Sequence, residues 1–420
     1  MKFGIIGSGG REHAICYSLK KNPNNQVFCF PGNAGTESIS TNVNIDINNF
    51  QILKDYIKEK KIDIVIIGPE KPLVDGLADY LEENNIKVFG PNKIASQLEG
   101  SKIFTKKICE EYNIPTAKFG IFKSVEESKI FIKNSSLPIV IKADGLASGK
   151  GVYISETIED AFKAVDEIFG GKFGVSNNIL IEEFLDGEEM SFFIISDGNN
   201  IAEFETAQDH KRVLEGDRGK NTGGMGAYCP SRLITPVLRE KIINKIINPT
   251  LKALKNLNTQ YKGFLYAGLM IKNDEPFLIE YNVRMGDPEC QTILPKLKTD
   301  FSKIIDACCK KNLDKINIEW ETKKSMCIVV CSKGYPDEFK KNIAIKNLDK
   351  LAVDQSNIIF HAGTIKKNTD IFSNGGRVLN FINLSEDFLE ARKKIIKNIK
   401  TLNWQEGFFR SDIGHRVIKE

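Results

Sequence analysis

The chain has 420 residues, of which 41% are hydrophobic and 27% charged, and its formal net charge is +4. This length predicts two to four domains, and the composition is that of globular proteins with large apolar cores. Basic and acidic residues are interspersed rather than gathered in blocks. The charge therefore favours neither nucleic acid nor a membrane as a partner.

No apolar run is long enough to cross a bilayer, and the first apolar run, Phe3–Ile6, leaves no room for a secretory signal before it. The nine cysteines include no Cys-x-x-Cys pair, and the four histidines lack zinc-ligand spacing. We therefore expect a cytoplasmic protein with reduced thiols.

The first hundred residues alternate short apolar runs with amphipathic stretches. Strands are expected at Phe3–Ile6, Gln26–Phe30, Ile62–Ile67 and Lys87–Phe89, and helices at Glu12–Lys20, Phe50–Lys60 and Val74–Glu83. This alternation predicts a Rossmann-like parallel sheet with helices on both faces.

The middle of the chain mixes helices with hairpins. Helices are expected at Lys102–Tyr112, at Ile158–Phe169 and from Thr235-Pro236 to Ile247, and strands at Lys118–Phe122, Pro138–Lys142, Val152–Ser155, Ile179–Glu183, Ser191–Ser196, Phe264–Ile271 and Phe277–Asn282. The last two strands form a hairpin through Asn273–Pro276. Residues 205–230 are polar and Gly-rich without periodicity, which predicts a long functional or disordered loop.

The last segment predicts a small α+β domain. Its strands are expected at Met326–Cys331, Ile358–His361 and Val378–Ile382, and its helix at Phe388–Leu402.

A glycine loop, Gly7–His13, follows the first strand and opens the first helix, where backbone N–H groups favour an anion. A dinucleotide site needs a small residue where Glu12 stands and an acid at the end of the second strand, where Phe30-Pro31-Gly32 occurs. NAD and FAD are therefore disfavoured, while a sugar phosphate and a tight turn without ligand both remain open. Pro31–Thr36 and Gly68-Pro69-Glu70 follow other strands at the same sheet edge.

A second glycine loop, Gly145–Gly151, is one residue too short for a P-loop and is followed by a strand rather than a helix. It predicts a hairpin whose tip covers phosphates, with Lys142 in the preceding strand. An ordinary hairpin with a surface lysine is the alternative. Downstream, apolar Ile179–Ile181 runs into the acidic stretch Glu182–Glu189, which suits a nucleoside. Taken alone, however, this stretch favours a strand end followed by a solvated acidic turn.

Side chains alternate faces along a strand, so Glu280, Asn282 and Arg284 are expected on one face, with Ile279 and Tyr281 on the other. A carboxylate, an amide oxygen and a guanidinium together predict a Mg²⁺–phosphate site. A half-solvated edge strand with a surface ion pair is the alternative.

These features resemble the ATP-grasp superfamily, and seven strings narrow the resemblance to the phosphoribosylamine–glycine ligase family. The strings are Gly-Gly-Arg-Glu-His-Ala (9–14), Pro-Gly-Asn-Ala-Gly-Thr (31–36), Leu-Glu-Gly-Ser-Lys (98–102), Ile-Lys-Ala-Asp-Gly-Leu-Ala-Ser-Gly-Lys-Gly-Val (141–152), Gln-Asp-His-Lys-Arg (208–212), Asn-Thr-Gly-Gly-Met-Gly-Ala-Tyr (221–228) and Gly-Asp-Pro-Glu (286–289). His-Ala-Gly-Thr (361–364) and Arg-Ser-Asp-Ile-Gly (410–414) extend it to the end of the chain.

The resemblance implies an α/β and α+β multidomain fold. A Rossmann-like domain would span residues 1–101, an ATP-grasp domain 102–323 with a hairpin lid at about 116–187, and a small α+β domain 324–420. It also implies a ligase of purine biosynthesis that joins glycine to 5-phosphoribosylamine through glycyl phosphate, with ATP as co-substrate and Mg²⁺ or Mn²⁺ as cofactor. Small molecules would be its partners, without nucleic acid, membrane or obligate protein partner, and a monomer fits the sequence.

The same resemblance implies the residue roles. Catalysis would use Arg284, Lys142 and Asp209, and metal binding Glu280 and Asn282. ATP would contact Lys102, Lys142, Ser148, Gly149, Lys150, Gly151, Glu182, Glu183, Phe184, Leu185 and Glu189. The other substrates would contact Gly9, Gly10, Arg11, Gly32, Asn33, Glu70, Pro72, Asp209, Asn221, Thr222, Gly223 and Arg284.

Three other functions are alternatives to this one. A different ATP-grasp enzyme, such as a carboxylase or a peptide-forming ligase, would share the lid and metal residues but not the strings at 9–14, 31–36 and 221–228. A dinucleotide-dependent oxidoreductase is disfavoured by Glu12. A non-catalytic nucleotide sensor is disfavoured by the presence of Lys142, Glu280 and Asn282.

Overall fold

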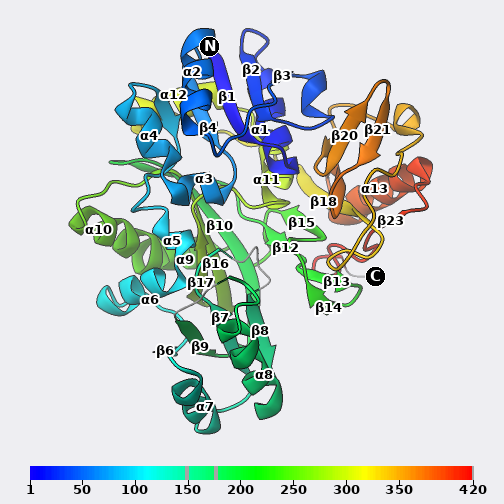
Figure 1. Cartoon of the computed structure of the whole chain (residues 1–420). Coiled ribbons are helices and arrows are strands. Elements are labelled where there is room, and N and C mark those ends of the chain that lie inside the picture. The colour runs from blue at the N-terminus through cyan, green and yellow to red at the C-terminus, as the bar shows by residue number, and fades with distance from the viewer. Residues whose placement is uncertain (147–150, 175–177, 419–420) are drawn as a thin grey trace.

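The computed structural model describes residues 1–146, 151–174 and 178–418. It confirms the predicted fold class, because a parallel N-terminal sheet is followed by antiparallel sheets and a C-terminal α+β part (Figure 1). Within the described residues, no helix is both long and apolar enough to span a bilayer.

The N-terminal sheet has five parallel strands in the order β3-β2-β1-β4-β5. The strands are β1 (Lys2–Gly7), β2 (Gln26–Pro31), β3 (Thr41–Asn42), β4 (Ile64–Ile67) and β5 (Lys87–Phe89). The helices are α1 (Gly10–Lys20), α2 (Phe50–Lys60), α3 (Glu70–Asp75), α4 (Leu77–Glu83) and α5 (Gln97–Gly100). The single helix expected at Val74–Glu83 is divided at Gly76, whose φ of +94° suits only a residue without Cβ.

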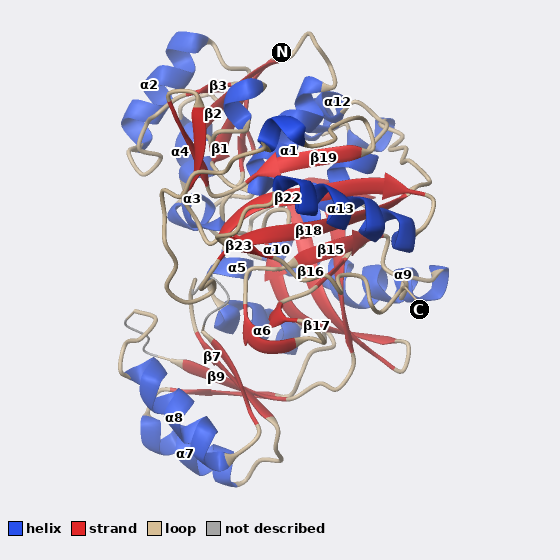
Figure 2. Ribbon diagram, turned by 90° about the vertical axis from the view of Figure 1, so that its right-hand side faces the viewer, coloured by secondary structure: helices blue, strands red, loops and turns tan. Residues whose placement is uncertain are grey.

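A separate lobe carries the antiparallel sheet β6-β9-β7-β8 and projects from the rest of the molecule (Figure 2). Its elements are β6 (Phe119–Phe122), α7 (Val125–Lys133), β7 (Ile139–Ala143), β8 (Val152–Ser155), α8 (Ile158–Phe169) and β9 (Ile179–Glu183), and α6 (Lys102–Glu111) precedes it. Apolar residues of α8 recur every three or four positions, which buries Ala161, Val165 and Ile168 in the core of the lobe. The predicted hairpin is confirmed, because Lys142 of β7 pairs with Val152 of β8.

The larger antiparallel sheet has the order β11-β10-β16-β17. Its strands are β10 (Glu188–Asp197), β11 (Ile201–Glu203), β16 (Lys262–Lys272) and β17 (Glu275–Asn282), and its helices are α9 (Pro236–Ile242) and α10 (Asn248–Asn256). Thr235 caps α9 by accepting a hydrogen bond from the Leu238 backbone N–H, as the Thr-Pro pair predicted. The predicted hairpin turns through Asn273 and Asp274, which both have positive φ, as two-residue hairpin turns require.

The C-terminal sheet has the order β12-β15-β18-β22-β19, and β23 pairs with β18. Its strands are β12 (Gln208–Asp209), β15 (Gly226–Cys229), β18 (Lys324–Ser332), β19 (Asn357–His361), β22 (Arg377–Ser385) and β23 (Gly407–Phe408). The hairpins β13 (Arg212–Leu214)–β14 (Arg218–Asn221) and β20 (Thr364–Lys367)–β21 (Asp370–Ser373) and the helices α11 (Glu289–Ile293), α12 (Phe301–Cys309) and α13 (Phe388–Leu402) complete the fold.

The expectation of an irregular loop at residues 205–230 is wrong, because this segment contains four short strands, β12 to β15. Their polar, glycine-rich sequence shows no period, and β15 obtains its hydrogen bonds from β18, about a hundred residues further along the chain. Glycine is needed at position 226, because a Cβ there would lie 2.5 Å from the Cys327 carbonyl oxygen. Tertiary pairing, which local sequence does not reveal, therefore determines this segment.

Candidate active site

Two lysines share one buried carboxylate: Lys142 belongs to the lobe and Lys106 to helix α6, which precedes it. Lys142 Nζ lies 2.6 Å from Glu182 Oε2, and Lys106 Nζ lies 2.8 Å from Glu182 Oε1. Burial alone would raise the pKa of Glu182, but the two lysines outweigh it and hold that pKa below its ordinary value. Two cations on one carboxylate leave a net positive charge, which favours an anionic ligand.

Lys102, at the start of α6, lies beside this pair. Its ammonium donates to the Gly145 carbonyl oxygen at 2.9 Å, and the Ser101 hydroxyl donates to Asp144 at 3.1 Å. Burial lowers the pKa of Lys102, and nearby Lys142 adds to the shift while Glu280 opposes it. These contacts tie the end of β7 to α6 and bring Lys102, Lys142 and Glu280 within electrostatic range of one another.

The predicted metal ligands, Glu280 and Asn282, lie at the end of β17 and are both partly exposed. Neither side chain forms a hydrogen bond or an ion pair with another described residue. Glu280 interacts electrostatically with Lys102 and with Lys211. The Glu280 carboxylate beside two lysines and the Asn282 amide oxygen on the same strand, both without a side-chain partner in the described part, fit Mg²⁺ or Mn²⁺.

A metal at this place would need further ligands from outside the chain. No group of three or more His, Cys, Asp or Glu that could hold a metal occurs in the described part. Phosphate oxygens and water are the usual additional ligands of Mg²⁺ in sites of this kind.

The expected alternation along β17 is wrong at Ile279. Gly268 pairs with Glu280 and the next residue of β16, Leu269, pairs with Leu278, so Ile279 is an extra, bulged residue. As a result Leu278 and Tyr281 are buried in one core cluster, and Ile279 is partly exposed like Glu280. A bulge changes where neighbouring side chains point, and it occurs here beside the proposed metal ligands.

A further cluster joins β10, β12 and the following segment. Lys211 Nζ lies 2.6 Å from Glu189 Oε2. Burial raises the pKa of Asp209 to about 7, with Lys211 opposing the rise and the carboxylates of Glu289 and Glu189 adding to it. Because Lys211 also interacts with Glu280, this cluster borders the metal position.

Arginines connect the N-terminal sheet to the segment after β17. Arg284 lies 2.7 Å from Glu99 through Nη2 and 3.4 Å from Glu70 through Nε. Arg11 donates to the Met285 carbonyl oxygen at 3.2 Å and interacts electrostatically with Glu70. The predicted residues Arg11, Glu70 and Arg284 are therefore brought together, with the Arg284 guanidinium directed to two carboxylates.

Arg377 contacts the predicted residue Gly223 but was not itself among the predicted site residues. Its Nη1 donates to the Asp287 carbonyl oxygen at 2.6 Å and to the Gly223 carbonyl oxygen at 2.5 Å, and lies 3.1 Å from Asp287 Oδ1. Gly223 N–H in turn donates to the Tyr335 hydroxyl at 2.9 Å. The glycine pair just before Arg377 is the signal that could have marked it.

The glycine loop after β1 encloses a carboxylate. Gly9 N–H donates to Glu12 Oε2 at 2.6 Å, and Arg11 Nε lies 2.7 Å from Glu12 Oε1. A Cβ at Gly68 would lie 2.1 Å from the same carboxylate, and one at Gly10 would lie 2.5 Å from Asn380 Nδ2. The Gly9 N–H expected to bind phosphate therefore donates to Glu12. Gly10 in this loop and Gly68 after β4 also allow close packing.

Three other predicted substrate residues have structural contacts. Asn33 donates to the carbonyl oxygens of Ser8 and His361 at 2.8 and 2.9 Å, and its Oδ1 accepts from two backbone N–H groups. Gly32 has a φ of +78°, and Pro72 is buried in α3. These contacts position the edge of the N-terminal sheet, and the polar atoms of Asn33 are already occupied.

Where the structure describes them, the remaining predicted ATP and substrate residues lie at or next to the ends of strands. Ser148, Gly149 and Lys150 fall outside the described residues, whereas the Gly151 carbonyl oxygen accepts from Ala143 N–H at 2.8 Å. The three residues after Glu182 are at least partly exposed: Glu183, Phe184 and Leu185. Asn221 ends β14, and the Thr222 hydroxyl donates to the Lys211 carbonyl oxygen at 2.8 Å.

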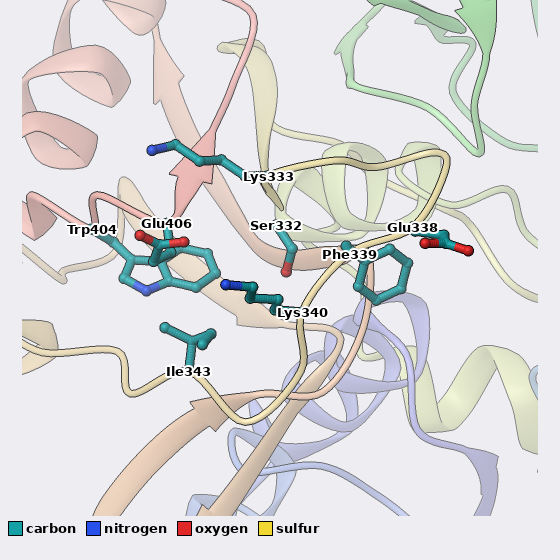
Figure 3. Close-up of a pocket in the computed structure, with 8 residues that line it drawn as sticks. All are labelled: Ser332, Lys333, Glu338, Phe339, Lys340, Ile343, Trp404 and Glu406. Carbon is teal, nitrogen blue, oxygen red and sulfur yellow. The ribbon is translucent and has the colours of Figure 1, made fainter.

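Two cavities differ in their relation to these clusters. A small one of about 10 Å³, room for roughly one water, is lined by Arg11, Gly68 and Arg284 among others. A larger one of about 370 Å³ lies in the C-terminal domain, where Lys340 points toward the Trp404 ring (Figure 3). The larger cavity contains none of the clustered site residues, so it is not the candidate active site.

The chain combines a parallel N-terminal sheet, an antiparallel lobe sheet that carries Lys142, and a larger antiparallel sheet that carries Glu280 and Asn282. This combination defines an ATP-grasp enzyme. Three domain families of phosphoribosylglycinamide synthetase match the chain: the N domain at residues 1–99, the ATP-grasp (A) domain at 100–290 and the C domain at 325–416. The chain belongs to the phosphoribosylglycinamide synthetase family, whose members are phosphoribosylamine–glycine ligases.

Individual relatives agree with this assignment. The phosphoribosylamine–glycine ligase of Brucella melitensis is 43% identical over 421 residues, which cover 100% of this chain and 99% of that protein. The crystal structure of the Thermotoga maritima phosphoribosylamine–glycine ligase has a TM-score of 0.85 at 33% identity, covering 98% of this chain and 100% of that one. A biotin carboxylase domain from Hydrogenobacter thermophilus, 17% identical with a TM-score of 0.70 over 95% of this chain and 89% of that one, shares the fold.

Proposed function

We propose that the chain joins glycine to 5-phosphoribosylamine with ATP, forming glycinamide ribonucleotide, ADP and phosphate in purine biosynthesis. The observation that carries the proposal is that Lys102 interacts electrostatically with both Lys142 and Glu280. Glu280, which has no side-chain partner among the described residues, also interacts with Lys211. These charges can hold a triphosphate and its metal beside a second substrate.

The chemistry needs activation of the glycine carboxylate, because a carboxylate oxygen is a poor leaving group. A carboxylate oxygen attacks the γ-phosphorus of ATP, and the bond to the β-phosphate oxygen breaks, so that ADP leaves and glycyl phosphate remains. The amine nitrogen of phosphoribosylamine then attacks the acyl carbon, the bond between that carbon and the phosphate oxygen breaks, and the nitrogen loses a proton. This route needs no nucleophile from the enzyme, so positioning and charge neutralisation are its tasks.

The ATP side of the site is proposed at the lobe. Lys102 and Lys142 would bind phosphate oxygens, while the Glu182 carboxylate keeps Lys142 in place. Glu280 and Asn282 would hold Mg²⁺ or Mn²⁺, which neutralises phosphate charge when bound. The ribose would lie at Glu189, and the adenine at the three residues after Glu182. Ser148, Gly149, Lys150 and Gly151 would cover the phosphates.

Glycine and phosphoribosylamine are proposed to lie between two groups of residues, one around Asp209 and Lys211 and the other around Arg11 and Arg284. Asp209 and the 221–223 segment would seat glycine, and Arg284 would neutralise charge on the reacting groups. The phosphoribosylamine phosphate would lie near Arg11 and the Gly9–Gly10 loop. Arg377, which holds the Gly223 carbonyl oxygen, would keep that segment in place.

The domain division, the oligomeric state, the localisation and the absence of macromolecular partners are also proposals. The proposed division into domains is 1–101, 102–323 (lid at about 116–187) and 324–420, and the contact of Arg284 with Glu70 and Glu99 crosses its first boundary. A cytoplasmic monomer without nucleic-acid, membrane or obligate protein partners fits a ligase of small molecules.

The decisive assay is ADP formation by the purified chain. We expect it to require Mg²⁺, glycine and freshly generated phosphoribosylamine together, with one glycinamide ribonucleotide formed per ADP. ADP formation that proceeds with bicarbonate in place of glycine would instead indicate carboxylase chemistry, and ATP binding without turnover would indicate a sensor.

A further inference from the structure

The C-terminal residues 410–416 hold the tip of the β13–β14 hairpin. Arg410 Nη1 lies 2.9 Å from Asp217 Oδ1 and donates to the Arg212 carbonyl oxygen at 3.0 Å. Its Nε and Nη2 contact both carboxylate oxygens of Asp412 at 2.8 and 2.7 Å. Only 1% of the Arg410 side chain is exposed. A buried guanidinium bound this way has one defined geometry.

The other residues of the hairpin tip bind to the same segment. Glu215 Oε1 accepts from the Ser411 N–H at 3.1 Å and from its hydroxyl at 2.5 Å. Gly216 N–H donates to Asp412 Oδ2 at 2.8 Å. Figure 1 shows β13 and β14 beside the C-terminal end of the chain. The whole tip, from Glu215 to Asp217, is therefore anchored outside the hairpin.

The base of the hairpin lies in the proposed active site. β13 starts directly after Lys211, which binds Glu189 at 2.6 Å. β14 leads into Thr222, whose N–H and hydroxyl both donate to the Lys211 carbonyl oxygen at 2.8 Å. Among the described strands, β13 and β14 pair only with each other. A two-stranded sheet is marginal by itself, so its position depends on the anchor at the tip.

We propose that Arg410 is a positioning residue: it fixes the β13–β14 hairpin and so directs Lys211 and Thr222 into the active site. The inference rests on the proposed function, because it takes those two residues as neighbours of the bound substrates. Arg410 itself touches neither substrate nor metal. Its effect on the reaction is transmitted through the Arg212 carbonyl oxygen and Asp217.

The test compares Arg410→Met, Arg410→Lys and Asp217→Asn with the wild-type chain, at a temperature where each is folded. We expect Arg410→Met and Asp217→Asn to lower kcat/KM for glycine by roughly tenfold or more, since small displacements of positioned groups are costly. Arg410→Lys keeps the charge and loses the bidentate fork, so an intermediate loss is expected. Hydrogen exchange at the Thr222 amide should be faster in Arg410→Met.

Lys296→Met is the matched control. Lys296 is also a buried cation, 2% exposed and 2.8 Å from Glu205, but it does not contact the hairpin. The Lys296→Met substitution should lower the unfolding midpoint and leave kcat and KM of the folded enzyme unchanged. Wild-type kinetics together with unchanged Thr222 amide exchange in folded Arg410→Met would overturn the inference about Arg410 and leave the proposed function standing. Absence of glycine-dependent ADP formation in the wild-type chain would overturn the proposed function, and this inference with it.

Discussion

At the scale of single residues, the proposed role of Glu280 as a metal ligand can be tested directly by substitution. It is unpaired among the described residues, yet it lies within electrostatic range of Lys102 and Lys211. Replacing Glu280 with alanine should leave a folded protein with kcat lower by roughly 10² to 10³, since one charge-stabilising group is lost. Glu275→Ala, on the same strand but paired with Lys241 at the surface, is the control. Steady-state ADP formation at saturating Mg²⁺ measures both, and near-normal turnover of Glu280→Ala would remove the metal assignment.

Asp209 predicts a pH dependence. Burial raises its pKa to about 7, so its carboxylate is half protonated near neutrality and becomes fully ionised at higher pH. If this carboxylate accepts the proton released by the attacking amine, kcat rises with pH through about 7 and levels off above. Asp209→Asn should abolish this step in the kcat–pH profile. A profile that is unchanged in the variant would exclude Asp209 as the proton acceptor.

At the scale of elements, α1 and β19 are joined by a neutral histidine. His13 Nδ1 accepts a hydrogen bond from the His361 N–H at 2.9 Å, and burial lowers the pKa of His13 to about 3. In the unfolded chain the His13 side chain takes up a proton near pH 6.5, whereas in the folded chain it stays neutral down to about pH 3. The stabilisation by His13 is therefore present above pH 6.5 and is lost as the pH falls toward 3. Lowering the pH from 6.5 to 4.5 should therefore lower the free energy of unfolding by about 2 kcal/mol through this histidine. Urea unfolding of wild type and His13→Gln checks this, and equal pH dependence in both would contradict it.

The junction of β15 and β18 gives a second prediction at this scale. A methyl group at Gly226 would lie 2.5 Å from the Cys327 carbonyl oxygen, which belongs to the backbone and cannot turn away. Gly226→Ala should therefore destabilise the protein by roughly 1–3 kcal/mol. It should also reduce activity, because β15 follows the 221–223 segment. Thermal unfolding measures the first effect, and an unchanged midpoint would show that the two strands can separate without cost.

Elements with a strong local period were predictable from sequence, and those defined by distant pairing were not. α13 and α8 lie at their predicted residues, since apolar positions and capping residues mark them. The four strands between residues 205 and 230 escaped prediction, because β15 is stabilised by β18. The same reason explains the bulge at Ile279, which no sequence pattern marks.

The candidate site residues divide in the same way, into those that local sequence marks and those that depend on distant contacts. Lys142 and Glu280 were predictable because each interrupts an apolar strand, where a charge needs a partner. Arg377 was not, since its partners Asp287 and Gly223 lie 90 and 154 residues away along the chain. Glu12 was noticed as a departure from the dinucleotide pattern, but its contact with the Gly9 N–H depends on the geometry of the folded loop.

At the scale of the whole molecule, the protein has a lobe that carries Lys142 and a body that carries the proposed metal ligands Glu280 and Asn282. The lobe has its own core, built from α7, α8 and its sheet. The larger cores include residues of both the N-terminal sheet and the sheet of β16 and β17, so those parts pack as one body. The lobe projects from that body (Figure 2), an arrangement that suits closure over a reactive acyl phosphate, which water would otherwise hydrolyse.

A crystal structure of the chain with Mg²⁺ and a non-hydrolysable ATP analogue tests the central claim most directly. The account predicts the triphosphate between Lys102 and Lys142 on one side and Glu280 and Asn282 on the other, with the metal bound to those two oxygens and to phosphate. A nucleotide bound away from this position, for example in the cavity beside Trp404, with Glu280 far from any phosphate oxygen, would contradict it.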